Sequence, residues 1–252
     1  MLVSVIVPMQ DEEGSLPSLA RELDGLATLL AARGHGLEAV LIDDGSTDGT
    51  WARAQGLAVD RATWRLLRHA TNRGFGAGLR SGVAAARGAV LVSYDADCAY
   101  PAGDVLALLD ALESGAQIAA ATPFAEGGVA GASAFRIFVS RACSAAYRVV
   151  LRRRAQGVRT FTCAFRAYRA EVLRASPWRA DGFLAAAEIL CRALLAGVRV
   201  VEVPSTLRGR TAGASKMRLW RTALAHVSLL ARLALTRRTR VVAALAGSGA
   251  AA

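Results

Sequence analysis

Apolar residues along the chain alternate between short β-branched runs and longer stretches with helical spacing. Residues 2–8 form a β-branched run that ends at a proline, which is typical of a buried strand. Residues 16–32 repeat leucine along one helix face, and Gly34 follows them. The same alternation predicts strands at 38–42, 64–68, 89–94 and 117–121, and helices that begin near 50 and cover 79–86 and 105–112. This order predicts an α/β fold with a mainly parallel sheet covered by helices on both faces.

The second half of the chain is less regular. Its apolar spacing predicts helices over 135–151, 184–195 and 219–235, and a β-branched run predicts a strand over 199–203. Residues 127–133 are rich in glycine, which is typical of a flexible connection.

Length and composition support a substantial buried core. The chain has 252 residues, 54% of them hydrophobic, which excludes a disordered protein and a small disulfide-stabilised domain. Its four cysteines include no Cys-x-x-Cys pair, and no signal peptide is recognisable, so we expect a reduced, cytoplasmic environment. The nearest candidate for a membrane span, residues 222–235, is interrupted by His226 and Arg232, so no spanning helix is expected.

The net charge of +11 is divided unevenly between the halves. Residues 1–126 carry 9 basic and 16 acidic side chains, whereas residues 127–252 carry 22 basic and 4 acidic ones. An acidic half suits a metal cation, and a basic half suits phosphates, nucleic acid or an anionic membrane. A compositional bias toward arginine explains the choice of arginine over lysine but not this division.

Four aspartates stand directly after predicted strands: Asp43, Asp44, Asp95 and Asp97. Parallel strands end at one edge of a sheet, where ligands gather, so we expect these carboxylates to line that edge. Asp95 and Asp97 could share one divalent cation, and oxygen ligands favour Mg²⁺ or Mn²⁺. Strand-end aspartates also cap helices, so this tripeptide alone does not establish a metal site.

Six motifs follow one another along most of the chain. They are PMQDEEGSLP at 8–17, DDGSTDGT at 43–50, NRGFGAGLRSG at 72–82, DAD at 95–97, FRAYR at 165–169 and VEVPSTLRGRTAGASKM at 201–217. In this order and spacing the chain resembles the family 2 glycosyltransferases, most of all their dolichol-phosphate mannosyltransferase and polyprenyl-phosphate glycosyltransferase branch. The resemblance implies the nucleotide-sugar-binding GT-A fold over residues 1–217, followed by an amphipathic helix and a basic, small-residue tail over 218–252.

The resemblance also implies a site for a nucleotide-diphospho-sugar, with GDP or UDP as the nucleotide. Pro8, Glu12, Asp43 and Asp44 would border the nucleoside, since carboxylates accept hydrogen bonds from a base N–H and from ribose hydroxyls. The alternative is that Asp44 and Ser46 cap a turn, and both can hold at once.

Three glycines, Gly74, Gly76 and Gly78, follow the third predicted strand. In the glycosyltransferase interpretation Gly74 and Gly76 let the backbone approach the donor, and in the alternative they only form a loop. Their spacing is not G-x-G-x-x-G, and the turn after the first strand has no glycine triplet, so a nicotinamide cofactor is not expected.

The implied reaction displaces a nucleoside diphosphate from the anomeric carbon with inversion. Mg²⁺ or Mn²⁺ on Asp95 and Asp97 would stabilise the departing diphosphate, with Arg210 and Lys216 as cationic donors. Lys216 is the only lysine beside thirty arginines, and its GASKM segment matches the Gly-x-Ser-Lys pattern of the family.

The acceptor decides whether a general base is needed. A polyprenyl phosphate brings an oxygen that is already anionic, because the second pKa of a phosphomonoester is near ~6. A hydroxyl acceptor would need a carboxylate base, for which Glu188 and Asp181 are the candidates. Glu188 stands in an apolar helix, so a salt bridge to a nearby arginine is the alternative interpretation.

The chain departs from the family pattern at several positions. Ala99 replaces a common glutamine after DAD, residues 122–124 read TPF in place of Gly-Ser-Arg, and residues 160–164 read TFTCA in place of Asp-x-Thr-Ser-Gly. Gln10 and Asp11 also replace an aromatic residue and an asparagine. Two alternatives therefore stay open: transfer to a soluble hydroxyl acceptor, and a relative that binds nucleotide-sugar or lipid without turnover. Nucleic acid is not expected as a partner, because it would not explain the strand-end carboxylates.

The last predicted helix combines an apolar face with cationic flanks. The apolar positions are Leu219, Leu224, Val227, Leu230, Leu233 and Leu235, and the cations are Arg218, Arg221, Arg232, Arg237, Arg238 and Arg240. Such a helix can lie in the interface of an anionic membrane, so we expect peripheral association with the inner face of the membrane. The alternative is that its apolar face packs on the protein's own core or on a second subunit.

Overall fold

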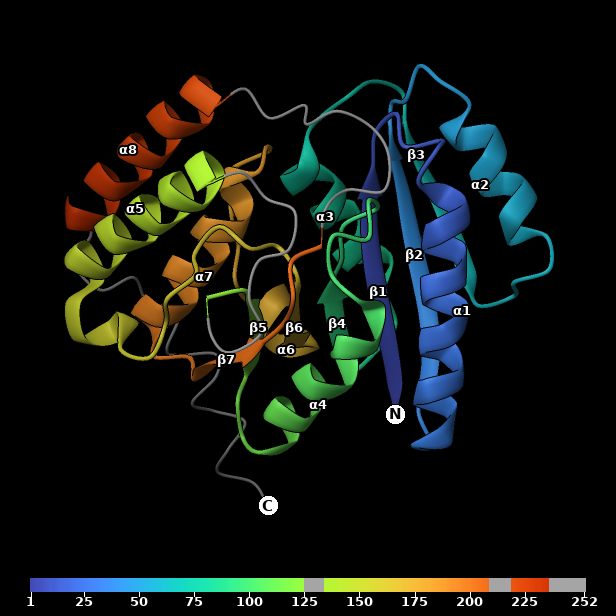
Figure 1. Ribbon diagram of the computed structural model, residues 1–252, viewed down its shortest axis with the longest axis horizontal. Coiled ribbons are helices and arrows are strands. Elements are labelled where there is room, and N and C mark those ends of the chain that lie inside the picture. The colour runs from blue at the N-terminus through green and yellow to red at the C-terminus, as the bar shows by residue number, and fades with distance from the viewer. Residues whose placement is uncertain (125–133, 209–218, 236–252) are drawn as a thin grey trace.

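The protein is a mixed α/β structure built on one seven-stranded sheet (Figure 1). The computed structural model describes residues 1–124, 134–208 and 219–235. The strands are β1 (Leu2–Met9), β2 (Gly36–Asp44), β3 (Trp64–His69), β4 (Val90–Ser93), β5 (Ile118–Thr122), β6 (Arg166–Arg169) and β7 (Val200–Pro204). The helices are α1 (Leu16–Ala32), α2 (Thr50–Ala58), α3 (Phe75–Ala85), α4 (Val105–Glu113), α5 (Ala134–Leu151), α6 (Ala170–Arg174), α7 (Leu184–Ala196) and α8 (Leu219–Leu235), with short 3₁₀ helices at Ala102–Asp104 and Arg152–Ala155.

The sheet is mainly parallel, as the sequence predicts. Its strand order is β3-β2-β1-β4-β6-β5-β7, and the pairs of β1 with β2 and β4, of β2 with β3, and of β5 with β7 are parallel. Only β6 is antiparallel, to both β4 and β5. The loops after β1, β2, β3, β4 and β5 therefore meet at one edge, and the antiparallel β6 begins at that same edge.

Two apolar layers cover the sheet. On one face, α1 and α4 cover buried side chains of the sheet such as Val3, Val5 and Val7. On the other face, α3, α6 and α7 pack on alternating positions that include Ile6 and Val40. Strands buried on both faces need continuous apolar sequence, which explains why β1 and β2 read as β-branched runs.

A third apolar cluster joins α5, α7 and α8 at one end of the molecule, seen at the left of Figure 1. Tyr147 and Leu151 of α5 and Leu190 of α7 pack with Leu229 and Leu233 of α8. One side of α8 thus packs on the protein's own core, as the alternative interpretation of this helix predicts. Within the described residues, no helix is both long and apolar enough to cross a bilayer.

The sequence prediction placed the start of α3 wrongly and missed two short elements, strand β6 and helix α6. Helix α3 begins at Phe75 rather than at residue 79, because the carbonyl of Asp181 accepts the first-turn amides of Gly76 (2.5 Å) and Ala77 (3.1 Å). Strand β6 was not predicted, because its four residues are too few to display a period, and its pairing with β4 and β5 is nonlocal.

Candidate active site

The strand-end aspartates lie on both sides of β1, at the edge where the parallel strands end. Asp43 and Asp44 close β2, and Asp95 and Asp97 follow β4; β1 pairs with both of these strands. The sheet thereby brings together carboxylates that lie far apart in the sequence. This edge is the candidate active site.

The Asp95–Asp97 segment forms a tight turn. Asp97 is only 6% exposed, and its Oδ1 accepts the amide of Ala99 at 3.1 Å. Cys98 takes a positive φ of 52°, and the carbonyl of Ala99 accepts the amide of Arg208 at 2.7 Å. The hydroxyl of Tyr94 donates to the carbonyl of Tyr100 at 2.6 Å and so connects the residues before and after the turn.

The chemistry of this turn fits a hard cation. Asp95 and Asp97 could supply carboxylate oxygens to Mg²⁺ or Mn²⁺, which commonly keep water and substrate phosphate as their other ligands. Burial raises the pKa of the neighbouring Cys98 thiol to about 11, so it is not a thiolate near neutral pH. Among the described residues, no three His, Cys, Asp or Glu side chains group as a metal cluster.

Asp43 and Asp44 are buried and bind the protein's own backbone. Asp43 is fully buried; its Oδ1 accepts the amide of Ser46 at 3.1 Å, and its Oδ2 lies 3.0 Å from Arg68 Nε. Asp44 is 3% exposed and accepts the amides of Arg73 (3.0 Å) and Gly74 (2.6 Å). The local contact with Ser46 caps the turn from Asp43 rather than from Asp44, which was the predicted capping residue, whereas Asp44 binds the loop after β3.

Pro8 and Glu12 lie beside these loops at the end of β1. Both are half-buried. Glu12 Oε2 accepts the hydroxyl of Ser15 at 2.8 Å, and the amide of Glu12 donates to Thr50 Oγ1 at 2.8 Å. The predicted nucleoside-bordering set, Pro8, Glu12, Asp43 and Asp44, thus comes from two adjacent strand ends.

The glycines Gly74 and Gly76 face another protein segment. A Cβ at Gly74 would lie 2.6 Å from the carbonyl oxygen of Asp181, and a Cβ at Gly76 would lie 2.2 Å from that of Ala180. The space in front of both glycines is therefore filled by the backbone before α7. Their lack of a side chain permits close protein packing on this side, and their contact with the donor stays a prediction.

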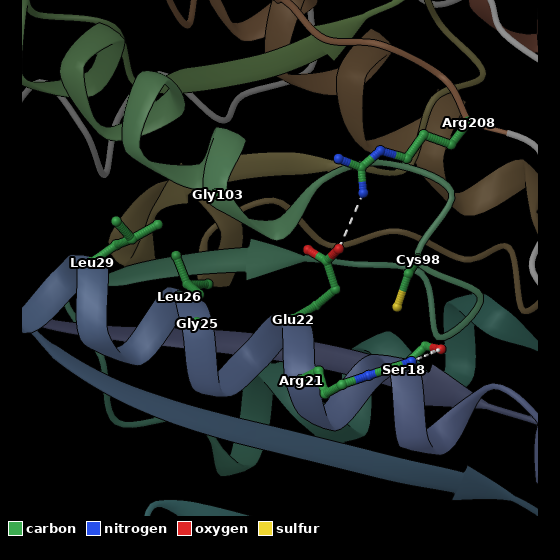
Figure 2. A pocket seen from close by; sticks show the side chains of 9 residues that line it. All are labelled: Ser18, Arg21, Glu22, Gly25, Leu26, Leu29, Cys98, Gly103 and Arg208. Carbon is green, nitrogen blue, oxygen red and sulfur yellow. Dashed lines mark hydrogen bonds and ion pairs between the residues drawn. The ribbon is translucent and has the colours of Figure 1, made fainter.

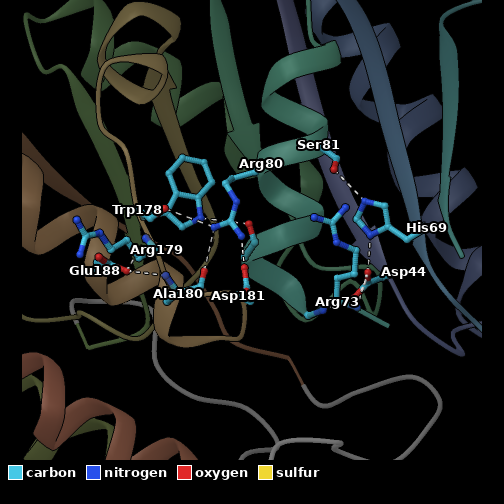
Figure 3. A network of polar contacts seen from close by, with 12 residues as sticks. Asp44, His69, Arg73, Arg80, Ser81, Trp178, Arg179, Ala180, Asp181 and Glu188 are labelled. Atoms are coloured by element: carbon cyan, nitrogen blue, oxygen red, sulfur yellow. Dashed lines mark hydrogen bonds and ion pairs between the residues drawn. The ribbon is translucent and has the colours of Figure 1, made fainter. Parts of the chain in front are cut away.

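Both carboxylate oxygens of Glu188 accept hydrogen bonds within the protein (Figure 3). It is 1% exposed; its Oε1 accepts from Arg192 at 2.9 Å, and its Oε2 accepts the amides of Arg179 (3.0 Å) and Ala180 (2.8 Å). This arrangement matches the salt-bridge alternative. The other candidate base, Asp181, has a side chain that is 65% exposed and paired with Arg80.

Two predicted cationic donors, Arg210 and Lys216, lie outside the described residues. The last described residue before them is Arg208. Its amide contacts Ala99, and its guanidinium lies 3.1 Å from Glu22 of α1. The segment that carries both predicted donors therefore begins on the Asp95–Asp97 turn.

Comparison with known proteins decides the family. Residues 4–176 match the sequence profile of glycosyl transferase family 2. The chain belongs to glycosyl transferase family 2.

Individual relatives of this glycosyltransferase extend the comparison. It is 30% identical over 219 residues to a dolichol-phosphate mannosyltransferase of Pyrococcus furiosus, covering 86% of this chain and 60% of the relative. It is 32% identical over 230 residues to a polyprenol monophosphomannose synthase of Mycolicibacterium smegmatis, covering 84% of this chain and 80% of the relative. The chain thus spans less than two thirds of the length of the first of these relatives.

Solved structures confirm the GT-A fold. Glucosyl-3-phosphoglycerate synthase from Mycobacterium tuberculosis, in a complex with Mn²⁺, UDP and its product, has a TM-score of 0.68 at 20% identity. The match covers 94% of this chain and 81% of that chain. At this identity the likeness establishes the fold.

Residues 160–164, which depart most from the family pattern, make several hydrogen bonds with other segments. Glu202 Oε1 on β7 accepts the amides of Arg159 (2.7 Å) and Thr160 (2.6 Å), and burial raises the pKa of Glu202. The hydroxyls of Thr122 and Thr160 lie 2.5 Å apart, and those of Ser140 and Thr162 lie 2.7 Å apart. The two segments that depart from the family pattern, 122–124 and 160–164, are therefore joined by the hydrogen bond between Thr122 and Thr160.

Sequence reasoning missed a buried cation beneath this segment. Arg166, the first residue of β6, is fully buried and donates to the carbonyls of Ala186 and Phe161. Within the part of the chain that the structure describes, its Nε has no hydrogen-bond partner. The FRAYR motif contained this residue, but nothing local showed that β6 would be enclosed between β4 and β5.

A cavity of about 450 Å³ lies behind the Asp95–Asp97 turn (Figure 2). Leu26 and Leu29 of α1 line one part, and Cys98 lines the end nearest the turn. The ion pair of Glu22 and Arg208 crosses it, and Glu22 Oε2 also accepts the amide of Ala102 at 2.8 Å. Glu22 thereby links α1 both to the loop after β4 and to the segment after β7.

Proposed function

We propose that this protein transfers a sugar from a nucleotide-diphospho-sugar to a polyprenyl phosphate at an anionic membrane surface, with inversion at the anomeric carbon. The observation that carries the proposal is the similarity to two polyprenyl-phosphate mannose synthases over 84–86% of this chain. Transferases named for undecaprenyl phosphate match it as well, at 28–30% identity over 69% of the chain.

The chemistry of the edge supports this substrate class. In the transfer, the acceptor phosphate oxygen forms a bond to the anomeric carbon while the bond to the donor diphosphate breaks. A bound Mg²⁺ or Mn²⁺ would neutralise charge on the departing diphosphate, and Asp95 and Asp97 would hold it. The acceptor oxygen is already anionic, so the reaction needs no general base, in keeping with a Glu188 whose oxygens are all engaged.

The proposal is tested with a panel of nucleotide sugars and Mn²⁺, each with and without a polyprenyl phosphate. We expect one GDP- or UDP-sugar to give a lipid-linked sugar only when the polyprenyl phosphate is present. Transfer to a soluble hydroxyl acceptor alone would contradict the proposal. Nucleotide binding without transfer under any condition would instead favour a non-catalytic relative.

We expect Lys216→Ala to lower turnover by on the order of 10²-fold, the usual effect of removing one charge-stabilising donor. A compact ammonium contacts a phosphate as a point charge, so Lys216→Arg should recover only part of the rate. Initial rates at saturating and subsaturating donor and lipid check this, with Arg53→Ala on the exposed side of α2 as the control. Parental rates for Lys216→Ala would remove Lys216 from the site.

Exposed faces of α5 and α8 support the membrane part of the proposal. On α5, Phe135 is 62% exposed, Phe138 is 68% exposed and Val149 is 75% exposed, all on one helix face. On α8, Leu224 is 61% exposed and Val227 is 62% exposed. The two helices contact each other and run side by side in Figure 1. Their outer faces thus present a broad apolar surface, as an interfacial helix pair would.

Cations border this apolar surface. Arg141 and Arg148 are exposed along one side of the α5 stripe, Arg152 and Arg153 follow its end, and Arg232 is exposed on α8. Cations close to an anionic bilayer contribute about 1 kcal/mol each. Apolar contact flanked by arginine is the pattern that favours an anionic lipid surface over a neutral one.

We expect the double variant Phe135→Ser/Phe138→Ser to bind anionic vesicles at least about tenfold more weakly than the parent, since burying one phenylalanine is worth about 1.5–3 kcal/mol. Flotation with anionic and neutral vesicles measures this. Val59→Ser, at a position that is 79% exposed beyond α2, is the matched control. Equal flotation of parent and double variant would contradict the membrane assignment. Truncation of the chain after Met217 would be a poorer test of membrane binding than these point variants. It would also remove Leu229 and Leu233 of α8, which pack in the core.

A further inference from the structure

A buried histidine connects three elements at the carboxyl-terminal edge of the sheet. His69, the last residue of β3, is 9% exposed. Its Nδ1 lies 2.6 Å from Asp44 Oδ1 at the end of β2, and its Nε2 lies 2.8 Å from Ser81 Oγ in α3 (Figure 3). Both ring nitrogens are engaged, because a serine hydroxyl can donate or accept. The imidazole thereby ties the end of β2 to the middle of α3.

Asp44 carries this connection to the loop after β3. Its Oδ1 also accepts the amide of Arg73 at 3.0 Å, and its Oδ2 accepts the amide of Gly74 at 2.6 Å. The loop after β2 touches the same segment directly, since a Cβ at Gly45 would lie 2.4 Å from the carbonyl carbon of Thr71. One carboxylate therefore sets the position of residues 70–74 relative to residues 43–47.

The orientation of that carboxylate depends on His69. Without the imidazole, Oδ1 of Asp44 would keep the Arg73 amide but lose its shortest hydrogen-bond partner at a buried position. A buried acceptor that loses a partner is costly, and the contact is charge-assisted, so the group would reorient toward any remaining donor or toward water. The amides of Arg73 and Gly74 would then lose their fixed acceptor.

We propose that His69 is a positioning residue of the nucleotide site. It holds the Asp44 carboxylate and so fixes the loop 43–47, which would border the nucleoside of the donor, against residues 70–74, without touching the donor itself. This inference rests on the proposed function and on the family resemblance, which implies that Asp43 and Asp44 border the nucleoside.

The order serine, histidine, aspartate also resembles a hydrolytic triad, but two features oppose that role. Ser81 lies inside helix α3 rather than on an exposed turn, and Asp44 binds two backbone amides in addition to the imidazole. Labelling of Ser81 by a serine-reactive fluorophosphonate would overturn the positioning role.

Three variants of the full chain separate the contacts. His69→Ala removes both hydrogen bonds, whereas His69→Asn keeps an amide donor near the position of Nδ1 and loses only the serine contact. Ser81→Ala removes the same serine contact from the other side. The matched control is His35→Ala, because His35 lies next to the start of β2, at the opposite edge of the sheet.

Two readouts are needed: hydrogen exchange at the Arg73 and Gly74 amides, and the Kd for UDP and for GDP with Mn²⁺. For His69→Ala we expect exchange at least about tenfold faster and nucleotide binding about tenfold weaker, with kcat at saturating donor changed less than about twofold. His69→Asn and Ser81→Ala should lie closer to the parent, and His35→Ala should match it.

The outcomes distinguish this inference from the proposed function. If the parent binds neither nucleotide, the proposed function fails and this inference fails with it. If the parent binds but His69→Ala leaves exchange or Kd unchanged, only the role of His69 is overturned. A fall in kcat at unchanged Kd would also overturn it, because His69 would then act on the chemical step.

Discussion

Replacing Asp97 with asparagine is expected to reduce sugar transfer by on the order of 10³-fold, the upper part of the range for losing one preorganised stabilising group. The substitution removes a negative charge from the turn that would hold the metal. Asparagine keeps an oxygen that can accept the Ala99 amide, which now lies 3.1 Å from Asp97 Oδ1. The variant should therefore stay folded, and initial rates together with Mn²⁺ affinity in the presence of nucleotide measure its effect.

Alanine at the same position separates structure from chemistry. Asp97 is 6% exposed rather than open to solvent, so Asp97→Ala should also cost about 1 kcal/mol of unfolding free energy through the lost hydrogen bond. Asp110→Ala, which removes an exposed carboxylate paired with Arg33 on the side of α4, is the control and should keep full activity. Undiminished transfer by Asp97→Asn, or by the parent in excess EDTA, would refute the metal assignment.

Replacing Gly76 with alanine is expected to lower the free energy of unfolding by about 2–3 kcal/mol or more. The new Cβ would lie 2.2 Å from the carbonyl oxygen of Ala180 and 2.6 Å from the Cβ of Ala185. The first of these is backbone, which cannot move aside without displacing the segment before α7. Chemical denaturation with a two-state fit measures the loss.

Gly56→Ala in α2 is the matched comparison for Gly76→Ala. A Cβ there meets nothing within 4 Å, so this change should raise the unfolding free energy by about 0.5–1 kcal/mol, the helix propensity difference between the two residues. The pair also distinguishes the two roles considered for Gly76. Unchanged stability of Gly76→Ala with a weakened donor Kd would restore the donor-approach role and contradict the packing role.

Local sequence patterns were sufficient for the first half of the fold. The β-branched run that became β1 and the leucine repeat that became α1 each show their element type and their buried positions in their own sequence. The rule that parallel strands end at one edge then predicted that Asp43, Asp44, Asp95 and Asp97 would share that edge. The family motifs added the GT-A fold, which the solved structures confirm.

The roles of individual residues at that edge depended on contacts between distant segments. Trp178 Nε1 donates to the carbonyl of Gly76 across 102 positions of sequence, and the neighbouring backbone of Ala180 and Asp181 fills the space in front of Gly74 and Gly76. A glycine in a sequence shows only that some close approach occurs, not what approaches. The apolar surroundings of Glu188 in the sequence likewise indicated that it needs a hydrogen-bond partner. Only the tertiary structure identifies the partners as Arg192 and two backbone amides.

The sequence by itself determined most of the strands and helices, the family, and the edge where the carboxylates gather, because neighbouring residues carry the periodicity and the motif spacing. Only the tertiary structure decided that β6 runs antiparallel with a buried Arg166, that His69 connects Asp44 to Ser81, and that α8 packs one side on the core while its other side stays exposed. The physical reason is the same in each case. A buried polar or charged group must find a partner, and that partner can come from any segment that the fold brings within hydrogen-bond distance.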